Sequence, residues 1–95
     1  MMPRPHDPPC RPVRFELLAT ADTGLLPRAL APFARRDLIP DRVRARRQGT
    51  AMLVEIGMDA MPSEVLHLIE GNLRQIVGVQ CVAVVLCAGG QRQAI

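Results

Sequence analysis

The chain has 95 residues, 48% of them hydrophobic, and a net charge of +3. This length predicts a single small domain. There is no Trp or Tyr and there are two Phe residues, so the core must be aliphatic. Aromatic platforms for stacking on single-stranded nucleic acid are therefore nearly excluded. All 12 basic residues are arginine, which favours a compositional bias over selection for phosphate binding.

Residues 1–12 hold five of the nine prolines and predict a disordered or extended tail. The tail has no apolar run, so it does not resemble a signal peptide, and no stretch of the chain is long enough to span a bilayer. Cys10, Cys81 and Cys87 follow no metal-binding spacing and predict buried, reduced thiols. We therefore expect a cytoplasmic protein with no metal site and no cofactor.

Residues 13–19 alternate between apolar and mostly polar side chains, which predicts a strand with one buried face. The polar turn TADTG follows it. Residues 25–36 then carry apolar side chains at helical spacing and predict a helix. Asp22 or Thr23 is expected to cap this helix, and Pro32 predicts a kink or an early end.

Residues 41–47 and 50–58 predict two strands joined by a hairpin at Gln48-Gly49. Three arginines share one face of the first of these strands: Arg42, Arg44 and Arg46. Such a row predicts a solvated face or a protected sheet edge.

Residues 62–77 predict a second helix, followed by a last strand at 79–87 and a frayed tail at 88–95. Gly71 lies inside this helix at a cost of about 1 kcal/mol, which indicates a close contact there. Gly78 is expected to end the helix with a positive φ.

The order strand–helix–strand–strand–helix–strand predicts an α+β fold of the ferredoxin-like βαββαβ type. This fold is a four-stranded antiparallel sheet in the order 4-1-3-2, with both helices on one face and the second strand at an edge. The ordered domain is predicted to span 13–87. The uncovered face is predicted to be a contact surface that includes Arg14, Glu16, Leu18, Leu53, Glu55, Val82 and Val84.

No motif in the chain points to catalysis. The phosphate-binding patterns GxxxxGK[ST] and GxGxxG are absent, and no nucleophile is spaced to meet a base. We therefore predict no catalytic residues and no enzyme activity. Nucleic-acid binding is disfavoured, because no aromatic side chain accompanies the arginines that would carry it: Arg42, Arg44, Arg46 and Arg47.

Two spaced motifs follow the turn glycine, Gly24. The first is LxxFxxR, at Leu30, Phe33 and Arg36. The second is L-x-x-[LI]-V-x-V, at Leu73, Ile76, Val77 and Val79. Together with the order of the elements, these motifs resemble an ACT domain over about residues 13–86. More closely, they resemble the ACT domain of the small regulatory subunit of acetolactate synthase.

The resemblance implies a non-catalytic regulatory subunit of branched-chain amino acid biosynthesis. Such a subunit forms a homodimer through its edge strands and binds a thiamine-diphosphate-dependent catalytic subunit. The resemblance also implies that a small apolar amino acid such as valine binds at the dimer interface, between the first strand–helix turn of one subunit and the start of the second strand of the other. The implied ligand-binding residues are Ala21, Asp22, Thr23, Gly24, Leu25, Leu26, Ile39 and Pro40.

Two of these positions depart from the family pattern. Ala21 stands where members that bind amino acids usually carry Asn or Asp, and Ile39 stands where the regulatory subunits often have an Asn. Asp22, one place later than Ala21, either replaces the polar contact or repels an effector carboxylate. The alternative function is that of a stand-alone ACT-domain amino-acid sensor not tied to acetolactate synthase.

Overall fold

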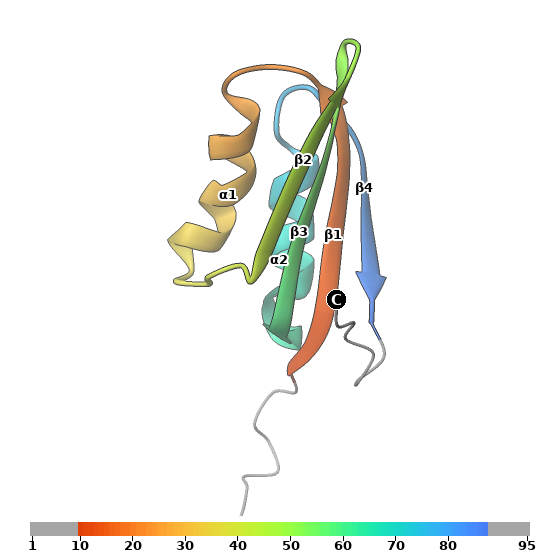
Figure 1. The fold of residues 1–95 in the computed structure, drawn as a ribbon. Coiled ribbons are helices and arrows are strands. Elements are labelled where there is room, and N and C mark those ends of the chain that lie inside the picture. Colours follow the sequence, from red (N-terminus) through yellow and green to blue (C-terminus); the bar gives the residue numbers. More distant parts are fainter. Residues whose placement is uncertain (1–9, 88–95) are drawn as a thin grey trace, which may run out of the picture.

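The computed structural model describes residues 10–87. Segments with alternating apolar residues form strands and segments with helical spacing form helices, which gives six elements in all. They are β1 (Cys10–Thr20), α1 (Leu25–Arg35), β2 (Arg42–Gln48), β3 (Ala51–Pro62), α2 (Ser63–Arg74) and β4 (Val79–Leu86). The strands form one antiparallel sheet in the order β2-β3-β1-β4, and both helices lie on the same side of it (Figure 1). The predicted ferredoxin-like fold and strand order are confirmed.

The core lies between the sheet and the two helices. Every second residue of β1 from Val13 to Ala19 is buried, as the alternation predicts. Phe15 of β1 meets Phe33 of α1 edge to face, with ring centroids 5.5 Å apart, an arrangement that aromatic pairs prefer. The remaining core side chains are aliphatic or Met, so the two phenylalanines join α1 to the centre of the sheet.

The prediction that Val82 and Val84 lie on the uncovered face of the sheet is wrong, as the register of β4 against β1 shows. Val82 lies opposite Leu17 and Val84 opposite Phe15, so both valines point toward the helices; Val82 is 7% exposed. The residues of β4 on the uncovered face are instead Cys81, Ala83 and Val85. The prediction failed because β4 is apolar on both sides, and its facing is set by pairing with β1 rather than by its own pattern.

Three element boundaries differ from the predictions by three or four residues, and several others differ by one. β1 begins at Cys10, so Cys10 and Arg11 of the predicted tail pair with the end of β3, and the register shifts between Arg11 and Val13. β3 continues to Pro62 instead of ending at residue 58, and α2 stops at Arg74 instead of residue 77. Residues 1–9 and 88–95, where we predict the tails, lie outside the described residues.

The end of α1 is fixed by a left-handed residue that is not glycine. Asp37 has φ 55°. The N–H of Leu38 donates to the carbonyl of Phe33 at 2.9 Å, and the N–H of Asp37 donates to that of Ala34 at 3.1 Å. These two bonds form a Schellman motif, in which the residue at the position of Asp37 is usually glycine. Pro32 is buried inside the helix, which ends three residues after it, in agreement with the short helix we predicted.

The hairpin between β2 and β3 closes on the pair Gln48 and Ala51, with Gly49 and Thr50 as its loop. Gly49 has φ 62°, whereas Thr50 has no positive φ. A positive φ at the first central residue alone is the signature of a type II′ turn, which matches the twist of paired strands. The predicted hairpin is confirmed, displaced by one residue.

Candidate functional site

The turn between β1 and α1 is closed by its own aspartate. The Oδ2 atom of Asp22 accepts the N–H of Gly24 at 3.0 Å and pairs with Nη1 of Arg28 at 3.1 Å. The carbonyl of Asp22 accepts the N–H of Leu25 at 3.1 Å. Gly24 is the N-cap residue, so the side-chain cap predicted from Asp22 or Thr23 does not form. Asp22 thus places a negative charge beside the helix start, where it would repel an effector carboxylate.

Few backbone donors remain at this helix start. The N–H groups of Gly24 and Leu25 already have acceptors within the turn, and Pro27 has no N–H. A helix N-terminus attracts anions through such donors and through its dipole. Most backbone N–H groups of this turn are therefore not available to an anion. The positive group beside the turn is the guanidinium of Arg28, whose side chain is 53% exposed.

The other predicted ligand residues, Ile39 and Pro40, lie at the far end of α1. The helix has 11 residues, which at about 1.5 Å each separate the two ends by roughly 16 Å. Figure 1 shows the turn before α1 at one end of the sheet and the connection into β2 at the other. One copy of the chain therefore does not bring the two predicted halves of the ligand site together.

An apolar groove of about 500 Å³ lies beside Ile39. The second half of α1, the connection to β2 and the first part of β2 line it: Leu30, Phe33, Ala34, Asp37, Leu38, Ile39, Pro40 and Val43. Ile39 is 83% exposed, which is unusual for an aliphatic side chain of this size beside an apolar groove. The groove suits an aliphatic group.

Our sequence analysis named Ile39 and Pro40 but missed the wall of the groove. Leu30 and Phe33 were interpreted as apolar helix positions and as part of the motif LxxFxxR, not as the lining of a groove. The available signal was the segment Leu38–Pro40, which continues the apolar character of the helix past its end. Leu38 folds back beside the last turn of the helix, where its N–H donates to the carbonyl of Phe33, whereas Ile39 stays exposed at the rim of the groove.

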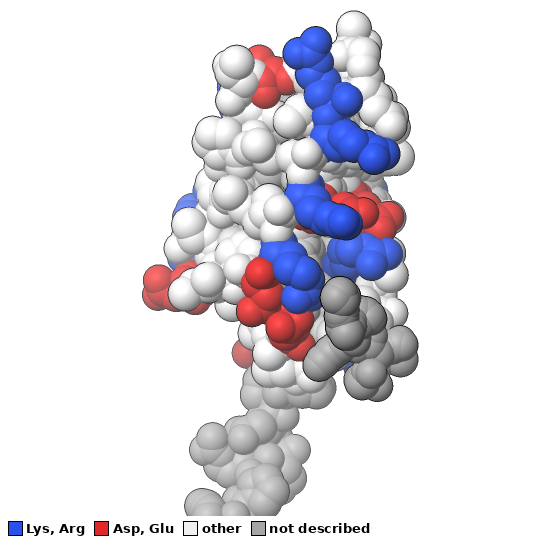
Figure 2. Space-filling view, in the orientation of Figure 1, with Lys and Arg blue, Asp and Glu red and all other residues white. Residues whose placement is uncertain are grey.

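Arginines gather in a stripe along β2 (Figure 2). Every residue of this strand is exposed. Arg42 donates to Asp59 at 2.8 Å, and this hydrogen bond raises the pKa of the Arg42 guanidinium. Arg44 lies 3.7 Å from Glu55. Within residues 10–87, no carboxylate lies within ion-pair distance of Arg46 or Arg47.

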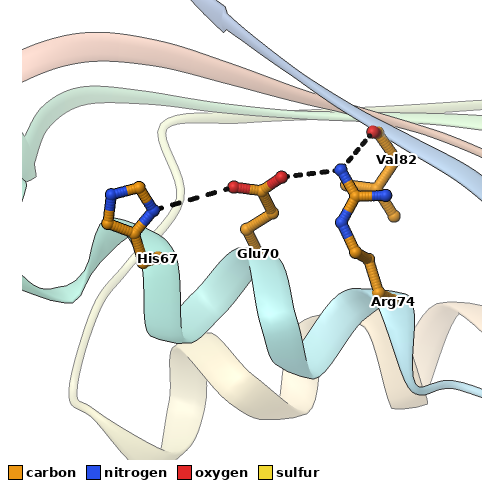
Figure 3. A network of polar contacts seen from close by, with 4 residues as sticks. All are labelled: His67, Glu70, Arg74 and Val82. Carbon is orange, nitrogen blue, oxygen red and sulfur yellow. Dashed lines mark hydrogen bonds and ion pairs between the residues drawn. The ribbon is translucent and has the colours of Figure 1, made fainter.

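The opposite edge of the sheet, β4, is partly covered by α2 (Figure 3). Nη2 of Arg74 donates to the carbonyl of Val82 at 3.1 Å and to Oε2 of Glu70 at 2.7 Å. The N–H of Cys87 donates to β1 at Pro12, so the alternation of an antiparallel strand turns the Val82 carbonyl outward. Arg74 therefore occupies an acceptor that a further strand would need.

Glu70 holds Arg74 in this position from the adjacent turn of α2. Its side chain is 24% exposed, and its Oε1 atom lies 4.0 Å from Nδ1 of His67. The side chain of His67 is itself 87% exposed. The three side chains form one row along α2, with the arginine at the sheet (Figure 3).

The cysteines correct a prediction. Cys10 and Cys81 are exposed and Cys87 is half-buried, whereas we predicted buried thiols. Cys81 lies on the face of the sheet that no helix covers, which explains its exposure. No group of three metal-ligating side chains occurs in the described part of the chain. None of its helices is long and apolar enough to cross a membrane.

Comparison with protein families identifies the chain over nearly its whole length. The family model described as an ACT-like domain matches residues 9–89. No curated protein matches the chain at a significant level. The matched residues cover all six elements of the sheet and helices.

Proposed function

Because the chain belongs to the ACT-like domain family, we propose that it is a non-catalytic regulatory module that binds a small apolar amino acid and controls a partner enzyme. The apolar groove beside Ile39 carries this proposal. It is an open groove of about 500 Å³ next to the start of β2, the segment at which members of this family are expected to hold an effector. An aliphatic side chain such as that of valine matches its lining.

The effector site is completed by a second copy of the chain. Two copies that pair antiparallel through β2 bring the turn Ala21–Leu26 of one copy toward Ile39 and Pro40 of the other. The separation of roughly 16 Å between these segments in one copy supports this, because neither segment is a complete site alone. Within the described residues, the β2 edge is exposed and the β4 edge is partly covered, which favours β2 as the paired strand.

The partner that we propose is the thiamine-diphosphate-dependent catalytic subunit of acetolactate synthase, in the cytoplasm. The support is the resemblance of the two spaced motifs. In the fold, Phe33 and Leu73 of these motifs are buried, and Arg36 donates to Oδ1 of Asn72 at 3.2 Å, joining α1 to α2. A pulldown from native extract tests the partner: recovery of the catalytic subunit supports the proposal, and its absence under conditions that retain the bait contradicts it.

The alternative is a stand-alone amino-acid sensor. It is favoured by the groove itself, which lies within one chain and needs no enzyme to form. Titration calorimetry across the twenty amino acids decides this point. Heat with a small apolar amino acid, and no complex in the pulldown, supports the sensor; no heat and no thermal shift reject it.

A further inference from the structure

The two edges of the sheet differ in how open they are. At the β4 edge, the guanidinium of Arg74 donates to the outward carbonyl of Val82. All seven residues of β2 are exposed, and the strand has β3 as a neighbour on one side. Every second residue of an antiparallel edge strand directs its N–H and C=O away from the sheet. The β2 edge can therefore receive a further strand.

The side chains of β2 specify what that strand should carry. Arg42, Arg44 and Arg46 lie opposite Gly57, Glu55 and Leu53 of β3, all on the uncovered face. These three arginines at a spacing of two residues are called the arginine row below. Arg46 has no carboxylate partner within residues 10–87, and the Arg44 side chain is 76% exposed, at the long distance of 3.7 Å from Glu55. The row therefore has unused capacity to bind carboxylates.

A second copy of β2 is a poor match for the arginine row. Residues directly opposite one another on antiparallel neighbours share a face of the sheet. When two copies pair with all helices on one side, even-numbered residues of β2 face even-numbered residues of its copy. In every such register that pairs most of the residues of β2, at least one arginine of one copy lies directly opposite an arginine of the other. Like charges directly opposite weaken a strand pair, so this self-pairing is weak.

We propose that β2 is an exchangeable edge, which binds an extended acidic segment of a partner protein more tightly than it binds a second copy of the chain. In the complex, the segment adds as a fifth strand. Its backbone pairs with β2, and carboxylates at every second residue lie opposite Arg42, Arg44 and Arg46. This is strand addition to a sheet edge, in which the main chain gives affinity and alternate side chains give specificity.

The inference rests on the proposed function, because it supplies a form of regulation for that module. An effector bound between two copies stabilises their self-pairing, and self-pairing occupies the edge that the acidic segment needs. The effector and the partner segment are therefore antagonists at β2, and by linkage each lowers the affinity of the other.

The test uses the full chain and a labelled twelve-residue peptide of alternating Glu and Thr. Fluorescence anisotropy measures binding, and analytical ultracentrifugation measures the oligomeric state. We expect the peptide to bind and to convert self-paired chains into single chains with one peptide each.

Arg46→Glu should weaken peptide binding about tenfold and strengthen self-pairing, because it places a glutamate of one copy opposite an arginine of the other. Arg35→Glu, at an exposed arginine at the end of α1, is the matched control and should change neither.

Three further probes locate the binding. A peptide with Lys in place of Glu should not bind. A peptide with Pro at a central Thr keeps its charge but loses strand pairing, and should bind much more weakly. A twelve-nucleotide single-stranded DNA tests general attraction of anions by the arginine row. Equal binding of the Pro peptide, equal or tighter binding of the DNA, or peptide bound to an intact self-paired dimer each overturns the inference. Because these readouts need no catalytic subunit, failure of the pulldown leaves them unaffected.

Discussion

The carboxylate of Asp22 lies 3.0 Å from the backbone nitrogen of Gly24 and accepts its N–H. The turn that the family is expected to use for effectors thus contains an anion of its own. The same oxygen pairs with the exposed Arg28 side chain, so the charge is only partly neutralised. The negative charge opposes the carboxylate of an amino acid that approaches this helix start.

Asp22→Asn should therefore strengthen amino-acid binding. The amide oxygen of Asn can still accept the N–H of Gly24, but the charge is gone. Removing one charge about 4 Å from a bound carboxylate is worth about 1 kcal/mol at the dielectric constant of water, or roughly a fivefold gain in affinity. Titration calorimetry with valine measures it. Glu64→Gln, at an exposed carboxylate in the first turn of α2, is the control; weaker binding by the Asp22 variant alone contradicts our interpretation of the turn.

Ile39→Ser should reduce effector binding without changing stability. The Ile39 side chain is 83% exposed, so its loss should alter the free energy of unfolding by no more than about 0.5 kcal/mol. Loss of its contact with an aliphatic ligand should lower the affinity about tenfold, because a buried aliphatic group contributes about 1.5 kcal/mol. Val77→Ser is a matched control, since Val77 is 85% exposed but lies outside the groove. Equal effects of the two variants on binding would show that Ile39 does not contact the effector.

Asp37→Gly should stabilise the chain. Asp37 occupies a left-handed conformation with φ 55°, which glycine adopts at no steric cost. We expect a gain of about 1 kcal/mol, which for a chain of this size raises Tm by about 4–8 °C. Asp37→Ala should lower Tm, because alanine keeps the strain and lacks the local polar contacts of aspartate. A thermal melt that ranks Ala above Gly contradicts the Schellman geometry.

Gly71→Ala should also stabilise the chain, against our expectation from the sequence. Within the described residues, a Cβ at this position meets nothing closer than 4 Å, so the predicted close contact is absent. Replacing glycine by alanine inside a helix gains about 1 kcal/mol. Urea unfolding measures the change. Gly78→Ala should do the opposite, because Gly78 has φ 94°, and stabilisation by both variants would show that the backbone differs from this description.

The fold was predictable because its signals are local. Four alternate residues of β1 are buried, and Gly49 and Gly78 mark turns with positive φ where the chain must reverse. The two-residue period of a strand and the 3.6-residue period of a helix can each be recognised in a short window of sequence. The order of strands and helices along the chain then leaves few permitted topologies.

The facing of β4 and the extent of β3 were not predictable in the same way. Val82 and Val84 face the helices because of their register against Leu17 and Phe15, and the sequence of β4 alone contains no alternation that reveals it. β3 continues past residue 58 because Met61 pairs with Arg11 of β1, a contact between residues distant in sequence. Such nonlocal pairing decides these details.

The candidate site was predictable only in part. Ile39 and Pro40 were named from the resemblance, whereas the groove beside them exists because the Schellman turn at Asp37 folds Leu38 back toward Phe33. The occupation of the turn by Asp22 depends on the rotation of one side chain. Neither feature has a sequence period, so both required the three-dimensional arrangement.

The most direct test of the proposed function is reconstitution with the catalytic subunit of acetolactate synthase from the same cell. The rate of acetolactate formation is measured with and without the chain, and then with added valine. We predict a stable complex by size-exclusion chromatography, a higher rate in the complex, and a fall of that rate with valine that Ile39→Ser relieves and Val77→Ser does not. No complex and an unchanged rate at saturating concentrations of the chain would contradict it.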